Sequence, residues 1–167
     1  MVLKIVQYRK EKKNMSNKYL NNLGNHIVSL SLSNSFTDAK KEWVLDNVTI
    51  SEESESCPCG HENIKELCYI KNIINGNITF VGNVCVNKFV GIDTGNIFSG
   101  IKRIKADVYA NPNEDLIIYA YKKKILYDNE YTFLIDTKNK RKLSNKQLEW
   151  KRKINLKILD KLKIKSS

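Results

Sequence analysis

The sequence predicts an α+β protein: a small β-hairpin module that carries every cysteine, followed by a C-terminal bundle of three to four short helices. Two observations favour this class. All four cysteines lie between Cys57 and Cys85, around an Asn75-Gly76 pair typical of a hairpin turn. Helix-start signals then recur from residue 94 to residue 145, each followed by apolar residues at helical spacing.

The N-terminal third divides into an arm and the approach to the hairpin. Residues 1–34 are expected to form a basic, partly flexible arm, with at most a short strand from Val2 to Val6. The module should occupy residues 35–92 and open with a short helix from Asp38 to about Leu45, capped by Ser35 or Thr37. The acidic residues 51–56 are predicted to form an exposed linker.

The hairpin and the helices after it follow from local patterns. Strand-type residues flank Asn75-Gly76, and a short helix is expected over residues 85–90, with another from Thr94 or Gly95 to about Ala106. The apolar residues on which these predictions rest are Leu67, Tyr69, Ile73, Ile78, Phe80, Val84, Ile97, Phe98, Ile101 and Ile104.

Three further helices complete the basic helical region, residues 93–167. Asn111-Pro112-Asn113-Glu114 predicts a start with Pro112 in the first helical position, and that helix should reach about Lys124. Asp128 can cap a helix that ends near Lys138. Ser144 and Gln147 have the spacing of a capping box at the head of the last helix.

The spacing of the cysteines predicts a metal site. Cys57, Cys59, Cys68 and Cys85 are the candidate ligands of one structural Zn²⁺ ion, because zinc favours a tetrahedron of soft donors and four thiolates leave no position for a substrate. The module is then a zinc-bound, treble-clef-like hairpin. The alternative is that the cysteines are small buried apolar residues. His61 lies two residues beyond Cys59 and is the candidate to replace one cysteine; His26 has no such neighbour and is expected to be structural or exposed.

The same residues carry a resemblance. The stretch CPCGHENIKELCYIKNIINGNITFVGNVCVNKF, the preceding A-x-x-E-W from Ala39 to Trp43 and the L-S-x-K-Q element within residues 140–155 resemble zinc-finger-like, uncharacterised proteins of large DNA viruses, phages and some bacteria. This resemblance implies the four cysteines as ligands and Gly60, Asn75, Gly76 and Gly82 as turn positions. It implies no reaction.

The charge of the chain is concentrated at its two ends. Of the formal net charge of +11, residues 1–24 contribute +5, residues 25–100 contribute −4 and residues 101–167 contribute +10. We therefore expect nucleic acid, DNA or RNA, to bind the last helices with little sequence preference, because lysine far outnumbers arginine. The candidate residues are Lys138, Lys140, Arg141, Lys142, Lys146, Lys151, Arg152 and Lys153, with Tyr131, Phe133 and Trp150 as possible stacking surfaces. A surface of merely solvated charge is the alternative.

The sequence does not predict an enzyme. It lacks a glycine-rich phosphate loop and a plausible cluster of carboxylates with a histidine base, so no small-molecule substrate is expected. The rival to nucleic-acid binding is a zinc-scaffolded adaptor of viral or mobile-element origin that binds a protein partner.

Four clustered cysteines and the lack of an apolar leader or span predict an intracellular protein. It should be cytoplasmic or nuclear, in a host cell if viral, and neither secreted nor bound to a membrane.

Overall fold

The computed structural model describes the backbone of residues 2–164 and the side chains of residues 16–164. The chain divides into two compact units, Met1–Asp93 (unit 1) and Thr94–Ser167 (unit 2). The sequence analysis placed a boundary after residue 92. Each unit buries its own set of apolar residues.

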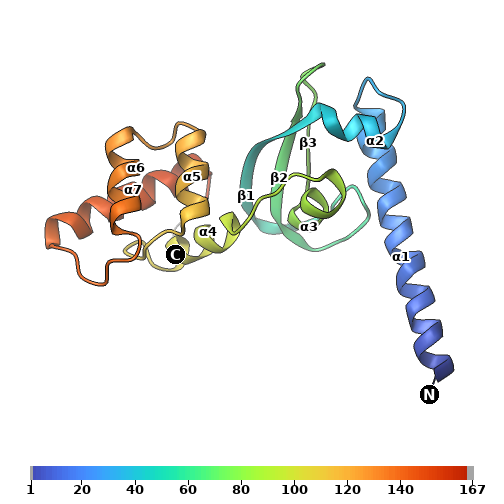
Figure 1. Cartoon of the computed structure of the whole chain (residues 1–167), viewed down its shortest axis with the longest axis horizontal. Helices are drawn as coiled ribbons and strands as arrows, with labels where there is room; N and C mark the ends of the chain where they lie inside the picture. Colours follow the sequence, from blue (N-terminus) through green and yellow to red (C-terminus); the bar gives the residue numbers. More distant parts are fainter. Residues whose placement is uncertain (1, 165–167) are drawn as a thin grey trace. The chain divides into compact units, whose positions relative to one another are not determined.

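Unit 1 is built on an antiparallel sheet of three strands, β1 (Trp43–Glu55), β2 (Ile64–Asn72) and β3 (Ile78–Gly82), in the order β1-β2-β3 (Figure 1). The α+β class is thereby confirmed. The register places Val48 of β1 and Val81 of β3 on either side of Cys68 in the middle strand, and all three residues are fully buried.

The expected N-terminal arm is instead mostly a helix, α1 (Val2–Ser29), which includes the residues predicted to form a short strand. Its C-terminal part lies beside the β3 side of the sheet (Figure 1). Leu23 and Ile27 of α1 are fully buried, so this part of the segment belongs to the core of unit 1.

The approach to the hairpin also differs from the prediction. Helix α2 (Phe36–Ala39), capped by Ser35, and the 3-10 turn η1 (Lys40–Glu42) end before Trp43, where β1 begins. The acidic residues predicted as a linker continue β1, because its backbone pairs with β2 as far as Glu55 opposite Ile64. An edge strand with exposed side chains tolerates this charge.

The hairpin turns around Asn75-Gly76, as predicted. The Asn72 side chain accepts hydrogen bonds from the Ile74 and Asn75 amides, and Gly76 has a φ of +79°, which glycine adopts without strain. The helical turn α3 (Asn83–Cys85) and the π-helical turn η2 (Val86–Val90) follow β3 directly.

Unit 2 contains α4 (Ile97–Ala106), α5 (Glu114–Lys122), α6 (Asp128–Thr137) and α7 (Asn145–Lys161). Helix α5 begins two residues later than expected, because Asn113 is its N-cap and accepts from the Leu116 amide at 3.0 Å. The Ser144–Gln147 capping box is confirmed, with hydrogen bonds of 3.3 and 3.0 Å.

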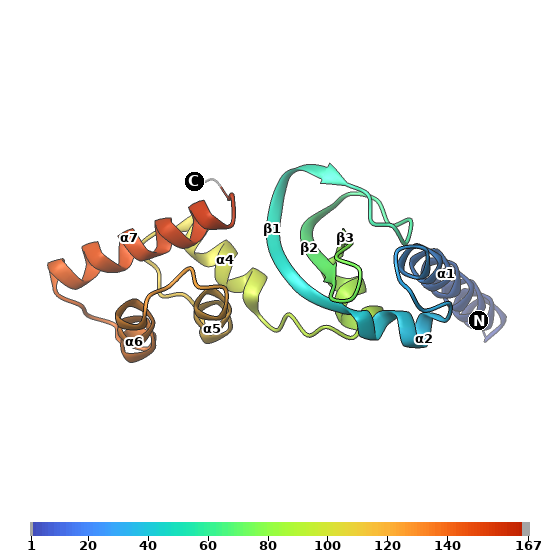
Figure 2. The ribbon, with the colours of Figure 1, turned by 90° about the horizontal axis from the view of Figure 1, so that it is seen from above.

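Helix α7 runs across the pair formed by α5 and α6 (Figure 2), and α4 packs against α5 and α7. The side chain of Asn155 on α7 donates to the carbonyls of Val108 and Ala110, which ties α7 to the loop after α4. Among residues 2–164 no helix has the length and apolarity that crossing a membrane requires. The core of unit 2 comprises Ile101, Ile104, Leu116, Ile117, Leu134, Ile154, Ile158, Leu159 and Leu162, each at most 1% exposed.

Candidate metal centre and basic surface

Three buried cysteines from two parts of unit 1 meet at one point. Cys57 and Cys59 lie in the short turn between β1 and β2, and Cys85 lies in α3, directly after β3. Their sulfur atoms all lie within 4.8 Å of one another. Chain segments 26 residues apart in sequence therefore present their thiols to one small volume.

The spacing of these sulfurs fits a metal better than a disulfide. The Sγ atoms of Cys59 and Cys85 are 3.4 Å apart, whereas a disulfide bond is about 2.05 Å long. Sulfurs bound tetrahedrally to one zinc ion at about 2.3 Å lie about 3.8 Å from each other. The three residues are also no more than 7% exposed. The group could thus hold a metal ion without large movement.

Backbone amides are already directed at two of the sulfurs. The Gly82 N–H donates to Cys57 Sγ and the His61 N–H donates to Cys59 Sγ, both at 3.4 Å. Such hydrogen bonds stabilise thiolates, the form of cysteine that binds metals. The Cys57 amide in turn donates to the His61 carbonyl at 2.9 Å, which closes the turn.

The protonation of the cluster reflects the closeness of its sulfurs. A hydrogen bond from the Cys85 thiol, aided by the Gly82 N–H, lowers the pKa of Cys57 to about 5. The same hydrogen bond raises the pKa of Cys85, and burial raises the pKa of Cys59. A metal ion that binds all three as thiolates therefore displaces protons from Cys59 and Cys85.

Cys68, the fourth predicted ligand, is not a member of this three-sulfur group. It is fully buried in β2, where its Sγ lies 4.0 Å from Asn83 Oδ1, and burial raises its pKa to about 12. Its cross-strand neighbour Val81 immediately precedes Gly82, whose amide binds Cys57. Cys68 thus lies in the strand adjoining the group.

Neither histidine belongs to the group. The His61 side chain is exposed and its ring packs edge-on to Tyr19, with ring centroids 6.0 Å apart. His26 is half-buried on α1, and its Nε2 lies 2.8 Å from the Thr79 hydroxyl of β3. Burial lowers the pKa of His26, which favours its neutral form.

Helix α1 supports the cysteine turn, a role that the sequence analysis missed. The Asn22 side chain donates to the Cys59 carbonyl at 3.0 Å. Gly60, which follows Cys59, has a φ of +97°, and a Cβ at this position would lie 3.3 Å from Asn22 Nδ2. No sequence signal marked Asn22, because asparagine is abundant in the arm and its partner is 37 residues away.

The eight predicted nucleic-acid-binding residues fall into three sets in unit 2. Lys138 is 2.6 Å from Glu114 and Arg152 is 3.0 Å from Glu149, so both are ion-paired. Lys151 is a correction: it is only 5% exposed and its Nζ donates to Asn111 Oδ1, so it belongs to the interior. The others are exposed and make no side-chain hydrogen bond or ion pair with the described side chains, residues 16–164: Lys140, Arg141, Lys142, Lys146 and Lys153.

The aromatic residues of this region stack on each other. Phe133, which is buried, stacks on Trp150 with centroids 4.3 Å apart, and Trp150 keeps 37% of its surface exposed. Tyr131 stacks on Tyr121 at the same centroid distance. Phe133 is thus a core residue, whereas Trp150 retains a solvent-facing surface.

Comparisons of the chain with protein-family models, with curated proteins and with solved structures find no significant match. The resemblance to zinc-finger-like viral, phage and bacterial proteins therefore remains an expectation.

Proposed function

We propose that this protein is a non-catalytic zinc protein whose unit 1 is organised by one structural Zn²⁺ ion in a treble-clef-like module. The convergence of the Cys57, Cys59 and Cys85 sulfurs is the observation that supports it. A thiolate set of this kind suits zinc, which has no redox chemistry and accepts tetrahedral sulfur ligands.

Cys68 is proposed as the fourth ligand. It is the remaining cysteine of the chain and lies fully buried in β2, where its cross-strand neighbour Val81 precedes Gly82, the residue whose amide donates to Cys57. With four thiolates the ion has no free position for water or substrate, which is why we assign it a structural role.

The metal content of purified protein tests this proposal. Protein prepared without chelator should contain one zinc ion per chain, and Cys57→Ser, Cys59→Ser and Cys85→Ser should each lose it to a competing chelator more readily than wild type. Tyr109→Leu, a change on the surface of unit 2, is the matched control and should keep the full content. A folded wild-type chain without metal would contradict the proposal.

We further propose that unit 2 binds nucleic acid with low sequence specificity. The supporting observation is the exposed group Lys140, Arg141, Lys142, Lys146 and Lys153, which has no acidic partner in the part of the chain that the structure describes. Lysines contact phosphates as point charges and read few bases, so affinity should depend strongly on salt.

The salt dependence of binding is the test. If about four of these residues contact phosphates, the logarithm of affinity should fall with the logarithm of salt with a slope of roughly −3 to −4. Replacing Lys140, Arg141, Lys142 and Lys146 by Gln should flatten this slope by several units. The control changes four unit 1 residues to Gln, namely Lys18, Lys65, Lys71 and Lys88, and should leave most of the slope.

A protein-binding adaptor is the second candidate, and one feature favours it. The tip of the hairpin exposes Ile73, Ile74 and Ile78, each more than half accessible. If wild type binds neither DNA nor RNA at low salt, or the quadruple Gln variant binds unchanged, nucleic-acid binding is wrong and this exposed apolar tip is the proposed contact for a protein partner.

A further inference from the structure

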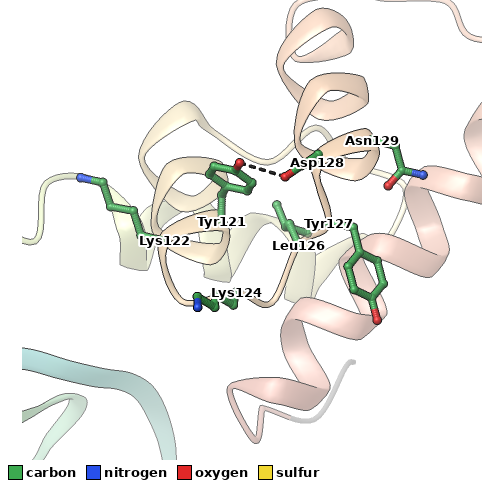
Figure 3. Close-up of a pocket in the computed structure, with 7 residues that line it drawn as sticks. All are labelled: Tyr121, Lys122, Lys124, Leu126, Tyr127, Asp128 and Asn129. Atoms are coloured by element: carbon green, nitrogen blue, oxygen red, sulfur yellow. Dashed lines mark hydrogen bonds between the residues drawn. The ribbon is translucent and has the colours of Figure 1, made fainter.

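Unit 2 has a surface hollow of about 840 Å³ on the side formed by the end of α5, the loop after it and the start of α6 (Figure 3). Its lining combines two tyrosines, two lysines and few other groups. The lining residues are Tyr121, Lys122, Lys124, Leu126, Tyr127, Asp128 and Asn129. None of them belongs to the basic group discussed above, so the hollow is a separate feature.

The two tyrosines are held in place while keeping exposed ring surface. Tyr127 is 69% exposed, and the Lys157 ammonium lies 3.8 Å from its ring centroid. Lys157 is itself fixed by Glu130 at 2.8 Å. One face of the Tyr127 ring therefore meets a cation, and most of the residue stays open to solvent.

Tyr121 is fixed in a comparable way. The Tyr131 ring stacks on the Tyr121 ring with centroids 4.3 Å apart. The Tyr121 hydroxyl donates to Asp128 Oδ1 at 2.9 Å. Tyr121 still exposes 38% of its surface. In Figure 3 Leu126 lies between the two tyrosines, and this buried side chain adds an apolar group to the lining.

Two lysines and the side-chain amide of Asn129 line the hollow together with the tyrosine rings. Lys122 ends α5 with its side chain directed away from the tyrosine rings, and Lys124 lies in the turn after it (Figure 3); neither forms an ion pair among the described side chains, residues 16–164. The Lys124 amide donates to the Tyr121 carbonyl at 2.9 Å, so the turn keeps this lysine beside Tyr121. Asn129 accepts from the Glu130 amide through Oδ1, which leaves its NH₂ group to donate.

We infer that this hollow binds single-stranded nucleic acid, with bases stacked on Tyr121 and Tyr127 and phosphates beside Lys122 and Lys124. This inference rests on the proposed nucleic-acid binding and names a second site for it. Exposed tyrosines next to unpaired lysines are the combination that single strands require, because every base has a face to stack and every link carries a phosphate. A duplex hides its base faces and cannot use the tyrosines.

The test measures the affinities of a fluorescent 12-nucleotide oligothymidylate, an abasic strand of equal length and a 12-base-pair duplex. Tyr127→Leu and Tyr121→Leu should each weaken binding of the oligothymidylate by about tenfold. They should leave the abasic strand and the duplex unchanged. Tyr109→Leu is the control, since Tyr109 is 46% exposed and lies outside the hollow. Tyr127→Trp should bind at least as well as wild type.

A second measurement does not depend on the variants. In protein with ¹³C-labelled tyrosine rings, the oligothymidylate should shift the NMR signals of Tyr121 and Tyr127 and leave that of Tyr109 in place. The inference is overturned if both Leu variants bind the oligothymidylate as tightly as wild type does. It is also overturned if the Leu variants lose as much affinity for the abasic strand as for the oligothymidylate. Absence of binding by wild type to all three probes would overturn the proposed nucleic-acid binding as well.

Discussion

The three clustered cysteines differ in what stabilises each sulfur. Cys57 receives the Gly82 amide and Cys59 receives the His61 amide, while Cys85 donates its proton within the cluster. Two of the three prospective thiolates thus have a neutral donor before a metal arrives. The hydrogen bond to Cys57 raises the pKa of Cys85, so a metal ion that binds Cys85 as a thiolate has to displace its proton.

Glu42 is a second residue with an unusual environment. The hydrogen-bond donors to its carboxylate are uncharged groups. Its carboxylate accepts from the Leu32 and Ser33 amides at 3.0 and 2.8 Å and from the Asn72 side chain at 2.6 Å. It therefore joins the loop after α1 to the end of β2. The hydrogen bonds from Ser33, Asn72 and Leu32 lower the pKa of Glu42 to about 2.

The pKa of Glu42 predicts a loss of stability in acid. A carboxylate whose pKa is lowered by folding stabilises the folded state above its unfolded pKa, here about 4.5, and this contribution disappears as the pH falls towards 2. Glu42→Gln should lower the free energy of unfolding of unit 1 at pH 7 and flatten its change between pH 4.5 and pH 2. Urea unfolding at several pH values measures both effects.

Asp38→Asn is the matched control for this prediction. Asp38 is exposed and pairs with Lys41 across one helical turn, so its removal should have little effect at pH 7. If Glu42→Gln and Asp38→Asn gave the same pH profile, the hydrogen bonds of Glu42 would not account for the acid sensitivity.

At the scale of elements, the cysteine turn between β1 and β2 depends on a backbone conformation and on α1. Gly60 has a φ of +97°, in the left-handed region that residues with a Cβ adopt only with strain. Asn22 of α1 holds the neighbouring Cys59 carbonyl. The turn is therefore shaped both by its own glycine and by a helix from another part of the chain.

Gly60→Ala should destabilise this turn and weaken zinc binding. The left-handed conformation costs a residue with a Cβ about 1–2 kcal/mol, and the added methyl group would also press on Asn22. Gly76→Ala is the matched control, because Gly76 has a φ of +79° but nothing within 4 Å of the added atom. Both variants should unfold at lower urea, whereas only Gly60→Ala should lose zinc to a competing chelator more readily. Equal zinc affinity in the two variants would contradict this role of the turn.

Local signals predicted the elements whose stability is local. The Asn75-Gly76 turn and the Ser144–Gln147 capping box act through residues within a few positions, and both occur in the structure. The last helices start and end within two residues of the expected positions at most boundaries.

Two segments were predicted wrongly: the helix α1, which was expected to be an arm, and the acidic end of β1, which was expected to be a linker. The polar residues of α1 gave no clear helical pattern, and in its described part, residues 16–29, the fully buried apolar side chains are Leu23 and Ile27. The acidic end of β1 has weak strand propensity and is held by pairing with β2, at Glu55 opposite Ile64. Pairing with β2 outweighed local propensity at the acidic end of β1.

At the scale of the whole molecule, the two units differ in charge and in what holds them together. Unit 2 carries a net charge of +10 and buries a continuous set of isoleucine and leucine side chains in four helices. Unit 1 has a sheet of three strands and places the cysteine cluster between its turn and α3. Only unit 1 should therefore require a metal to fold.

Removal of the metal should unfold one unit and spare the other. A structural zinc ion contributes on the order of 10 kcal/mol to a small module, whereas unit 2 has its own core and helix caps. After treatment with a strong chelator, amide hydrogen exchange should rise throughout β2, β3 and α3 and stay slow in α5 to α7. Restored zinc should reverse the change. Equal loss of protection along the whole chain would mean that the two units fold as one.

The candidate sites were predictable only in part, since residue type and spacing do not determine burial. The cysteine spacing identified Cys57, Cys59 and Cys85, which do converge, but it could not show that Cys68 lies outside their group. Similarly, Lys151 looked like its basic neighbours in sequence. Its position on the inner face of α7, where its ammonium binds Asn111, follows from helix packing.

The coordination of zinc in the purified protein tests the central claim most directly. X-ray absorption at the zinc edge should show four sulfur neighbours at about 2.3 Å in wild type. In Cys68→Ser it should show three sulfur neighbours and one oxygen or nitrogen neighbour at about 2.0 Å. A wild-type spectrum with an oxygen or nitrogen ligand, or a Cys68→Ser spectrum identical to wild type, would contradict the four-thiolate structural site.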